Sequence, residues 1–357
     1  MKKYILAINP GATSTKIAVF EGEQNIFTTN LKHSIEDLAK FALITDQYDY
    51  RKSFVLDELK NQNINLDEIA IVMGRGGLVK PLTSGVYRVN DLMKKHLLEG
   101  YNGVHACNLG GLIADSVAQM IGLKEAYIAD PVIVDEMDDI ARISGHKDFE
   151  RLSIFHALNQ KAIARIHAKS IGRKYEDLNL IVAHLGGGIS VGAHRKGRVI
   201  DVNQALEGEG PFSPERSGTL PMDQVIKACF SGKYTYDEMR KVIVGKGGLV
   251  SYLGTNDAYE VEKRALAGDQ YADFIQQAMA YQIGKQIAGN AAVLEGKVDA
   301  ILLTGGIAYG KPIVAHIKRY VEWIAPVAVY PGEDEMASMA MNACMILDGS
   351  VEVKDYV

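Results

Sequence analysis

Apolar runs that end in glycine-rich turns recur along this chain. Tyr4–Ile8 leads into a turn of glycine, proline and small hydroxyl residues, and a second apolar run, Ile17–Phe20, follows it. The pattern predicts strand, tight turn and strand. Leu180–Ala193 repeats it around three glycines, and Ala300–Leu303 ends in a Thr-Gly-Gly sequence. Because helical segments separate these strands, we expect an α/β protein.

The first turn has the features of a phosphate-binding loop. Gly11 is expected to adopt an unusual backbone dihedral, and Thr13, Ser14 and Thr15 offer hydroxyls and backbone N–H donors. Lys16 adds a positive charge at the mouth, so the turn predicts a phosphate cradle. It is not a Walker A loop, because GxxxxGK[ST] does not occur in the chain. Taken alone, this stretch favours the simpler interpretation of an ordinary hairpin with a polar turn.

The second hairpin favours the phosphate interpretation. Ala7-Ile-Asn9-x-Gly11 and Ala183-His184-Leu-Gly186 can be laid over each other, which makes the paired hairpin an internal repeat. Together with the strand end at Thr304–Ile307, they look like two phosphate loops and one nucleoside clamp. This arrangement resembles the actin-like (ribonuclease H-like) ATPase superfamily, whose two related domains hold a nucleotide in the cleft between them.

Composition narrows the class of protein. The 357 residues predict about two domains, with a boundary in the polar stretch 140–153. A net charge of −5 gives no reason to expect binding to nucleic acid or to an anionic membrane. The three cysteines are far apart, which fits a reducing compartment. The N-terminus offers too few apolar residues before Asn9 for a signal peptide, so a cytoplasmic protein is expected.

Four polar residues stand out by their position. Arg75 lies between glycines at a strand end and Arg216 lies in a loop rich in glycine and proline, and both could clamp an anion. Asp130 follows a strand, where open α/β sheets keep their chemistry. His156 is expected in the first turn of a helix that begins at Ile154. Solvated arginines, an aspartate that caps a turn and a packed histidine remain alternative interpretations.

Three consecutive acids, Glu333, Asp334 and Glu335, precede the last predicted helix, Met336–Leu347. Acids at a helix start stabilise the helix dipole without any further function. They could equally hold Mg²⁺.

These motifs together resemble the acetate kinase family over nearly the whole chain. The stretches that carry the resemblance are Ile8–Lys16, Gly74–Gly77, His105–Asn108, Asp130–Glu136, Phe155–Asn159, His184–Gly188, Pro214–Thr219 and Thr304–Gly306. Asn9–Gly11, Asp130–Glu136 and Phe155–Asn159 resemble the branch of the family that uses butanoate. Ala12 is a departure, because acetate kinases carry a serine there.

The resemblance implies roles for the candidates on the substrate side. Arg75 falls on an arginine that contacts the substrate carboxylate or the transferring phosphoryl group, and His105 falls on a substrate-binding position. Asp130 falls on the essential aspartate near the metal. Glu335 best matches the metal-associated glutamate, with Asp334 as the alternative.

The resemblance also implies roles on the nucleotide side. His156 and Arg216 fall on residues that stabilise the phosphoryl transition state. The positions implied to bind phosphates or adenosine are Asn9, Ser14 and Lys16 in the first loop, His184, Gly186, Gly187 and Gly188 in the second, and Gly305, Gly306 and Ile307 at the adenosine site.

The reaction that the resemblance implies is reversible transfer of a phosphoryl group from ATP to a short-chain carboxylate, giving an acyl phosphate and ADP with Mg²⁺ as cofactor. Butanoate is the expected acid, and isobutyrate, propionate and acetate are the alternatives. The implied layout is a first domain of residues 1–150 and 335–357, a second of 151–334, and a homodimer paired through the second. A different class, an actin- or Hsp70-like ATPase module, would leave Arg75 and Arg216 idle.

Overall fold

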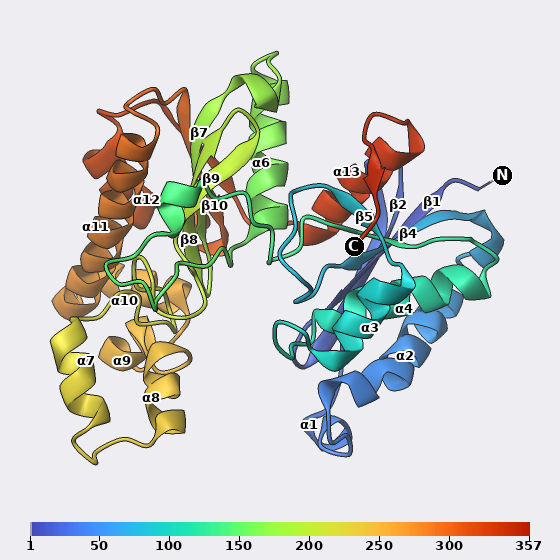
Figure 1. Cartoon of the computed structure of the whole chain (residues 1–357), viewed down its shortest axis with the longest axis horizontal. Coiled ribbons are helices and arrows are strands. Elements are labelled where there is room, and N and C mark those ends of the chain that lie inside the picture. Colours follow the sequence, from blue (N-terminus) through green and yellow to red (C-terminus); the bar gives the residue numbers. More distant parts are fainter. Residues whose placement is uncertain (1) are drawn as a thin grey trace. The chain divides into compact units, whose positions relative to one another are not determined.

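The computed structural model describes residues 2–357, which form two compact units. Unit 1 contains the chain through Val134 and again Asp334–Val357, and unit 2 contains Asp135–Glu333. Each unit is built on one β-sheet with helices on both faces (Figure 1). Within residues 2–357, no helix is both long and apolar enough to cross a bilayer.

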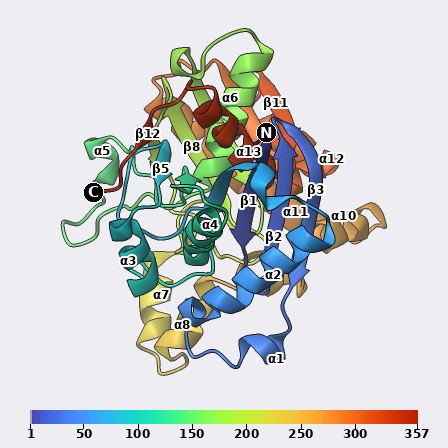
Figure 2. The same ribbon diagram turned by 90° about the vertical axis from the view of Figure 1, so that its right-hand side faces the viewer.

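Among residues 2–357, the sheet of unit 1 has seven strands in the order β12-β5-β6-β4-β1-β2-β3. Their bounds are β1 Tyr4–Pro10, β2 Ser14–Glu21, β3 Gln24–Lys32, β4 Ile69–Arg75, β5 Val86–Arg88, β6 Tyr127–Ala129 and β12 Val353–Lys354. The helices of this unit are α1 Ile35–Leu38, α2 Tyr48–Asn61, α3 Asp91–Glu99, α4 Asn108–Met120 and α13 Glu335–Leu347. α2 and α4 cover one face of the sheet, and α13 packs on β1 and β4 from the other (Figures 1 and 2).

The sheet of unit 2 has five strands in the order β11-β10-β7-β8-β9. Their bounds are β7 Asn179–Leu185, β8 Ile189–Arg195, β9 Arg198–Val202, β10 Ala300–Gly305 and β11 Val327–Pro331. The helices of this unit are α5 Asp139–Arg142, α6 Ala157–Ser170, α7 Met222–Cys229, α8 Tyr236–Ile243, α9 Gly248–Leu253, α10 Ala258–Leu266, α11 Gln270–Val293 and α12 Lys311–Val321.

The predicted internal repeat is confirmed by the strand pairing. In unit 1, β1, β2 and β3 are antiparallel neighbours and β4 lies parallel to β1. In unit 2, β7, β8 and β9 repeat this order and β10 lies parallel to β7. Both copies therefore place a glycine-rich turn beside the carboxyl end of a parallel strand.

The apolar run of β7 is explained by burial on both faces. Ile181 and Ala183 pack in the cluster that contains α11, whereas Leu180 and Val182 pack in the cluster that contains α6. Because side chains of a strand alternate between faces, a strand covered by helices on both sides must be apolar throughout. The core thus holds the carboxyl ends of the strands, where the candidate residues lie, in a rigid frame.

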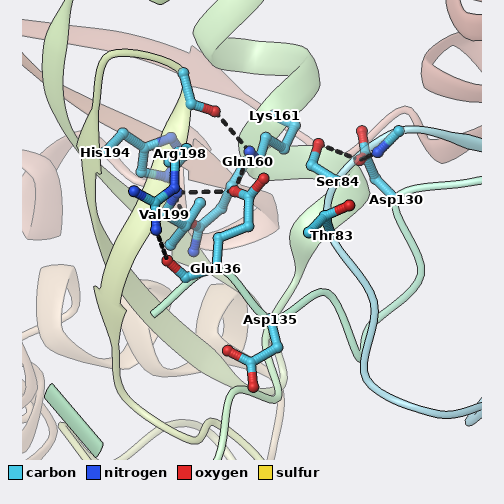
Figure 3. A network of polar contacts seen from close by, with 12 residues as sticks. Thr83, Ser84, Asp130, Asp135, Glu136, Gln160, Lys161, His194, Arg198 and Val199 are labelled. Carbon is cyan, nitrogen blue, oxygen red and sulfur yellow. Dashed lines mark hydrogen bonds and ion pairs between the residues drawn. The ribbon is translucent and has the colours of Figure 1, made fainter. Parts of the chain in front are cut away.

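The boundary between the units differs from the predicted one at residue 150. The structure divides the chain between Val134 and Asp135, because residues before 150 are bonded into unit 2. Glu136 accepts from the Lys161 ammonium at 2.6 Å and from the Val199 N–H at 2.9 Å (Figure 3). The polar composition of residues 140–153 predicted a linker between the units. The segment before them, which contains Glu136, already belongs to unit 2, so the boundary lies earlier in the chain.

Candidate functional site

Three neighbouring parallel strands of unit 1 bring predicted residues to one edge of the sheet. Ile8 of β1 pairs with Gly74 of β4, and Arg75 pairs with Ala129 of β6. Asn9, Arg75 and Asp130 therefore lie at adjacent strand ends, at the edge where open α/β sheets bind ligands.

Arg75 is a buried cation at this edge. It is 6% exposed, and its Nη2 lies 2.8 Å from Glu335 Oε1 at the start of α13. The amide of Asn9 donates to the other oxygen of the same carboxylate. Arg75 Nη1 is buried and has no hydrogen-bond partner within residues 2–357. A buried guanidinium nitrogen without a partner is costly unless a ligand supplies an acceptor.

The first turn of α4 lies directly on the end of β4, and the charge of Arg75 acts on the Cys107 thiol at the start of this helix. A Cβ on Gly74 would stand 2.3 Å from the carbonyl oxygen of Gly110, so this close approach requires glycine. His105 is exposed, and its Nδ1 accepts from the Cys107 N–H. Burial raises the pKa of the Cys107 thiol to about 11, so this cysteine remains neutral.

Asp130 is held in a strained and fully buried position. Its φ of 38° lies in the left-handed region, which few residues other than glycine adopt. The carboxylate accepts from the Ser84 hydroxyl at 2.6 Å and from the Gly85 N–H at 2.9 Å (Figure 3). These bonds hold Asp130 against the loop that precedes β5, and backbone strain of this kind is typical of functional sites.

The first hairpin turn is organised by a residue that sequence reasoning missed. Arg51 of α2 is 0% exposed, and its guanidinium donates to the carbonyl oxygens of Gly11, Ala12 and Ser14 at 2.8–2.9 Å. Gln47 accepts from the same side chain. Because these carbonyls point at Arg51, the shape of the turn is fixed from inside the unit. An arginine on a helix with mixed polarity gave no sign of this role.

The turn also differs in detail from the prediction. The strands continue further, so Lys16 lies on β2 opposite Asn9, and Ser14 is the first residue of β2. Lys16 is exposed there. The unusual dihedral predicted for Gly11 is wrong: its φ is outside the left-handed region, and an added Cβ would make ordinary contacts 3.6 Å away.

The second hairpin places His184 at the end of β7 and Gly186–Gly188 in the turn. Thr304 of β10 pairs with His184, which brings the third strand end beside the turn. Gly305 has φ of 90°, and a Cβ there would stand 2.3 Å from the carbonyl oxygen of Leu185. Glycine is therefore required at position 305 so that the two strand ends can meet.

Arg216 lies over the second turn. A Cβ on Gly188 would stand 2.0 Å from Arg216 Nη1, so the glycine makes room for the guanidinium. Nη1 donates to the Ala205 carbonyl at 2.6 Å, while Nε is buried without a hydrogen-bond partner within residues 2–357. The Ser213 hydroxyl ties this loop to the turn by donating to the Gly187 carbonyl at 2.5 Å. Burial lowers the pKa of Arg216 from its ordinary value, yet an arginine remains a cation.

His156 and His184 form a stacked pair beside this turn. Their ring centroids are 3.8 Å apart and the planes differ by 10°. His156 is the N-cap of α6 rather than a residue of its first turn, because the helix begins at Ala157. Its Nδ1 lies 2.9 Å from Ser190 Oγ. His184 Nδ1 lies 2.7 Å from Asn159 Oδ1.

The three consecutive acids have three different partners. Glu333 belongs to unit 2 and lies 3.0 Å from His184 Nε2. Asp334 caps α13 by accepting from the Ala337 N–H at 2.8 Å. Glu335 contacts Arg75. Glu335, rather than Asp334, thus lies with the strand-end residues of unit 1.

Unit 2 contains a cavity of about 370 Å³ that begins at the second turn. Gly306 and Ile307 line it, whereas Gly305 is not among its lining residues. The sequence did not predict most of the residues that line this cavity. Tyr259 and Tyr309, two tyrosines near loops, were only a weak sign of it. The lining residues are Gly186, Gly187, Pro214, Asn256, Asp257, Ala258, Tyr259, Glu262, Gln276, Gly306, Ile307, Tyr309, Gly310, Ile313 and Glu333.

Two of the carboxylates in unit 1 were predicted to hold a metal ion. Within residues 2–357, no group of three or more His, Cys, Asp or Glu side chains is placed to hold a metal ion. Mg²⁺ is usually bound by one or two carboxylates together with substrate phosphates, so a full protein cage is not required. Asp130 and Glu335 both lie near the strand ends of unit 1, and their role as such a partial donor set stays a prediction.

Solved structures show which fold this is. The chain matches the acetate kinase of Porphyromonas gingivalis with a TM-score of 0.76 and 18% identity, covering 97% of this chain and 100% of that one. It matches a propionate kinase from Francisella tularensis subsp. tularensis with a TM-score of 0.70 and 19% identity, covering 96% and 99%. The predicted α/β fold of two actin-like domains is therefore confirmed.

Sequence comparison shows the family. A model of the Acetokinase family matches residues 149–324. The protein named Butyrate kinase 2, from Clostridium acetobutylicum, is 55% identical over 356 residues, which cover 100% of both chains. The chain belongs to the acetokinase family, as its motifs predicted.

Proposed function

We propose that this chain is an ATP-dependent carboxylate kinase that converts butanoate and ATP to butanoyl phosphate and ADP, and that it also catalyses the reverse reaction. The observation that carries the proposal is a pair of buried arginines, one at each glycine-rich strand edge. Arg75 Nη1 and Arg216 Nε are buried donors without partners within residues 2–357. The relative named Butyrate kinase 2 supports butanoate as the acid.

The chemistry needs cations more than a base. A carboxylate is already ionised at neutral pH, so its attack on the γ-phosphate requires no strong general base. The enzyme must instead bring two anions together and stabilise the charge of the transferring phosphoryl group. We assign this to Arg75 and Arg216, with His156 as a hydrogen-bond donor and His105 on the substrate side.

The nucleotide is assigned to the hairpin turns and the cavity of unit 2. Gly186–Gly188 would receive phosphates on their backbone N–H groups, as Asn9, Ser14 and Lys16 would in unit 1. The cavity continues from this turn to Gly306 and Ile307. Tyr259 and Tyr309, 65% and 69% exposed, line it and offer ring faces to a planar base.

Mg²⁺ is the proposed cofactor, and it would neutralise phosphate charge when bound. Glu335 would hold it, because its carboxylate lies among Asn9 and Arg75 rather than in a helix cap. Asp130, fixed by Ser84 and Gly85, would orient water bound to the ion rather than remove a proton.

The proposal includes a homodimer and a cytoplasmic location. Exposed apolar side chains on and beside α7 of unit 2, namely Met222, Ile226 and Phe230, support a partner surface there. The three cysteines are free thiols, which fits a reducing compartment. Sedimentation equilibrium of the purified protein tests the dimer.

The decisive experiment is formation of acyl phosphate, trapped as a hydroxamate, from ATP and a series of acids from two to six carbons. Each buried CH₂ contributes about 0.8 kcal/mol, so two extra methylenes favour butanoate over acetate in kcat/KM by roughly tenfold or more. We expect a maximum at four carbons, a steep fall toward acetate and a shallow fall toward longer acids.

Three outcomes contradict parts of the proposal. Acetate faster than butanoate would show that the acid is wrong although the reaction class is right. Propionate or isobutyrate at the maximum would replace butanoate by that acid. Release of phosphate from ATP without any hydroxamate, equal with and without acid, would favour an actin- or Hsp70-like ATPase.

A further inference from the structure

A chain of buried polar side chains leads from His156 into the interior of unit 2. His156 Nδ1 lies 2.9 Å from Ser190 Oγ, and the Gln160 amide nitrogen donates to the same hydroxyl at 2.8 Å. Gln160 Oε1 lies 2.9 Å from His194 Nε2, and His194 Nδ1 lies 2.6 Å from the Tyr175 hydroxyl. Ser190, Gln160 and His194 are each 0% exposed. Figure 3 shows Gln160 beside His194.

The donor and the acceptor of each hydrogen bond in this series of side chains can be determined. The Gln160 amide nitrogen also donates to the Ser190 carbonyl at 3.1 Å, and a carbonyl can only accept. The amide oxygen of Gln160 therefore faces His194, so His194 Nε2 must carry a hydrogen. Gly192 keeps this arrangement open, because a Cβ there would stand 2.6 Å from Gln160 Oε1.

His194 is neutral and fixes the end of the hydrogen-bonded series that lies furthest from His156. Burial, together with the charges of Lys161 and Arg165, lowers the pKa of His194 well below its ordinary value. With its single hydrogen on Nε2, its Nδ1 accepts from the Tyr175 hydroxyl. Gln160 thus cannot exchange its oxygen and nitrogen without breaking bonds at both ends.

The hydroxyl hydrogen of Ser190 then has one possible direction, toward His156. Its oxygen accepts from Gln160, and the His156 backbone N–H also lies 3.5 Å away. If His156 Nδ1 donated to Ser190, the hydroxyl hydrogen would need another acceptor, and Gln160 presents only its NH₂ group. The hydroxyl hydrogen is therefore directed to His156 Nδ1.

We infer that Ser190 and Gln160 are positioning residues that hold His156 as the tautomer with hydrogen on Nε2. The inference rests on the proposed function, in which His156 donates to the transferring phosphoryl group. Neutral Nε2–H supplies that donor without a proton transfer. The stack on His184, with planes 10° apart, fixes the plane in which the donor lies.

The test is the ¹⁵N spectrum of protein labelled at histidine, which distinguishes Nδ1 from Nε2 protonation. The His156 signals are assigned by their loss in His156→Asn. In the wild type we expect hydrogen on Nε2. In Ser190→Ala and in Gln160→Met we expect a mixture of tautomers, with kcat about tenfold lower, the effect of one lost hydrogen bond. KM for ATP and butanoate should change less than twofold.

Ser190→Thr keeps the hydroxyl and should restore both the single tautomer and kcat. Ser231→Ala, an exposed serine of unit 2, is the matched control and should resemble the wild type. Hydrogen on His156 Nδ1 in the wild type would overturn the inference, as would an unchanged tautomer and kcat in both Ser190→Ala and Gln160→Met. The spectrum needs no turnover, so failure of the kinase proposal would appear separately, as absence of acyl phosphate from the wild type.

Discussion

At the scale of single residues, adjacent acids with the same chemistry have different tasks. Glu333 contacts His184, Asp334 caps α13 and Glu335 contacts Arg75, although they are consecutive in the chain. Glu333 belongs to unit 2, whereas Asp334 and Glu335 belong to unit 1 and have different partners there. The difference between Asp334 and Glu335 gives a direct test of the proposed metal site.

We predict that Glu335→Gln raises the Mg²⁺ concentration needed for half-maximal rate, because the variant loses a negatively charged ligand. Asp334→Ala is the matched control: loss of the helix cap should cost about 1 kcal/mol of unfolding free energy and leave the Mg²⁺ curve unchanged. Rate measured against Mg²⁺ decides between them. A shifted curve for Asp334→Ala only would move the metal to that residue.

Arg216 gives a second prediction at this scale. Arg216→Ala should lower kcat/KM by roughly 10²–10⁴, since a charge-assisted contact to the transition state is lost. The melting temperature should change little, because the Ala205 carbonyl is a single neutral acceptor. Arg240→Ala removes an exposed arginine of the same unit and serves as control. Normal kinetics in Arg216→Ala would remove this arginine from the site.

At the scale of elements, the first hairpin depends on α2 for its shape. Arg51 satisfies three carbonyls of the turn from the interior, and Thr15 of β2 lies 2.9 Å from His33 Nε2. The turn therefore cannot be considered apart from the helix and strand that hold it. Predicted phosphate binding by this loop depends on both.

We predict that Arg51→Met lowers the unfolding free energy by about 2–5 kcal/mol, since buried carbonyls lose their donor. It should also lower kcat/KM for ATP roughly tenfold, because the loop is no longer preorganised. Lys60→Met on the exposed side of α2 is the control. Urea unfolding and initial rates provide the measurements, and wild-type values for Arg51→Met in both would contradict the assignment.

His33 makes the stability of this hairpin depend on pH. Burial, with a smaller effect of the Arg51 charge, lowers the pKa of His33 from 6.5 to about 4. The unfolded chain therefore binds a proton near pH 6.5 that the folded chain excludes until about pH 4. The contribution of neutral His33 to the unfolding free energy is therefore fully present above pH 6.5. It decreases as the pH falls from 6.5 toward about 4.

We expect His33→Phe to lose less unfolding free energy than the wild type between pH 7 and pH 5. The unfolding free energy is measured by urea unfolding at both pH values. The cost of the lost Thr15 hydrogen bond is the same at both, so it cancels when the two free energies are subtracted. His146→Phe, at an exposed histidine, should keep the wild-type difference. The same pH dependence in His33→Phe would show that other groups cause it.

At the scale of the whole molecule, unit 1 is completed by the last residues of the described chain. Tyr356 is 3% exposed, and its hydroxyl lies 2.7 Å from His96 Nδ1 and accepts from the Lys80 N–H at 2.8 Å. Its carbonyl accepts from Asn90. Folding of unit 1 therefore requires contacts between residues that are far apart in the sequence, and we expect this unit to fold slowly.

We predict that Tyr356→Ala lowers the unfolding free energy of unit 1 by about 3–5 kcal/mol, and Tyr356→Phe by about 1 kcal/mol. Trp323, the single tryptophan, lies in unit 2, so its fluorescence reports that unit while far-UV circular dichroism reports both. In Tyr356→Ala the dichroism transition should shift further than the fluorescence transition. Equal shifts would show that the units unfold together.

The sequence by itself determined the features that depend on short-range pattern. The two hairpins, the glycine-rich strand ends and the internal repeat follow from apolar runs and turn residues, and the family follows from motifs of a few residues. Arg75, Asp130 and Arg216 could be singled out because glycine neighbours or a strand end marked them. The left-handed φ of Asp130 and the need for glycine at positions 188 and 305 were not visible, because they depend on packing.

Only the tertiary structure decided which residues act together. Arg51 reaches the first turn across a long stretch of sequence. Ser190, Gln160 and His194 meet because α6 packs on β7, the strand beside β8. The unit boundary lies at Val134–Asp135 because Glu136 bonds into unit 2, against the polar composition of 140–153. The physical reason is the same in each case: local pattern sets the conformation of a segment, whereas buried charges and hydrogen bonds are satisfied by residues that only folding brings into contact.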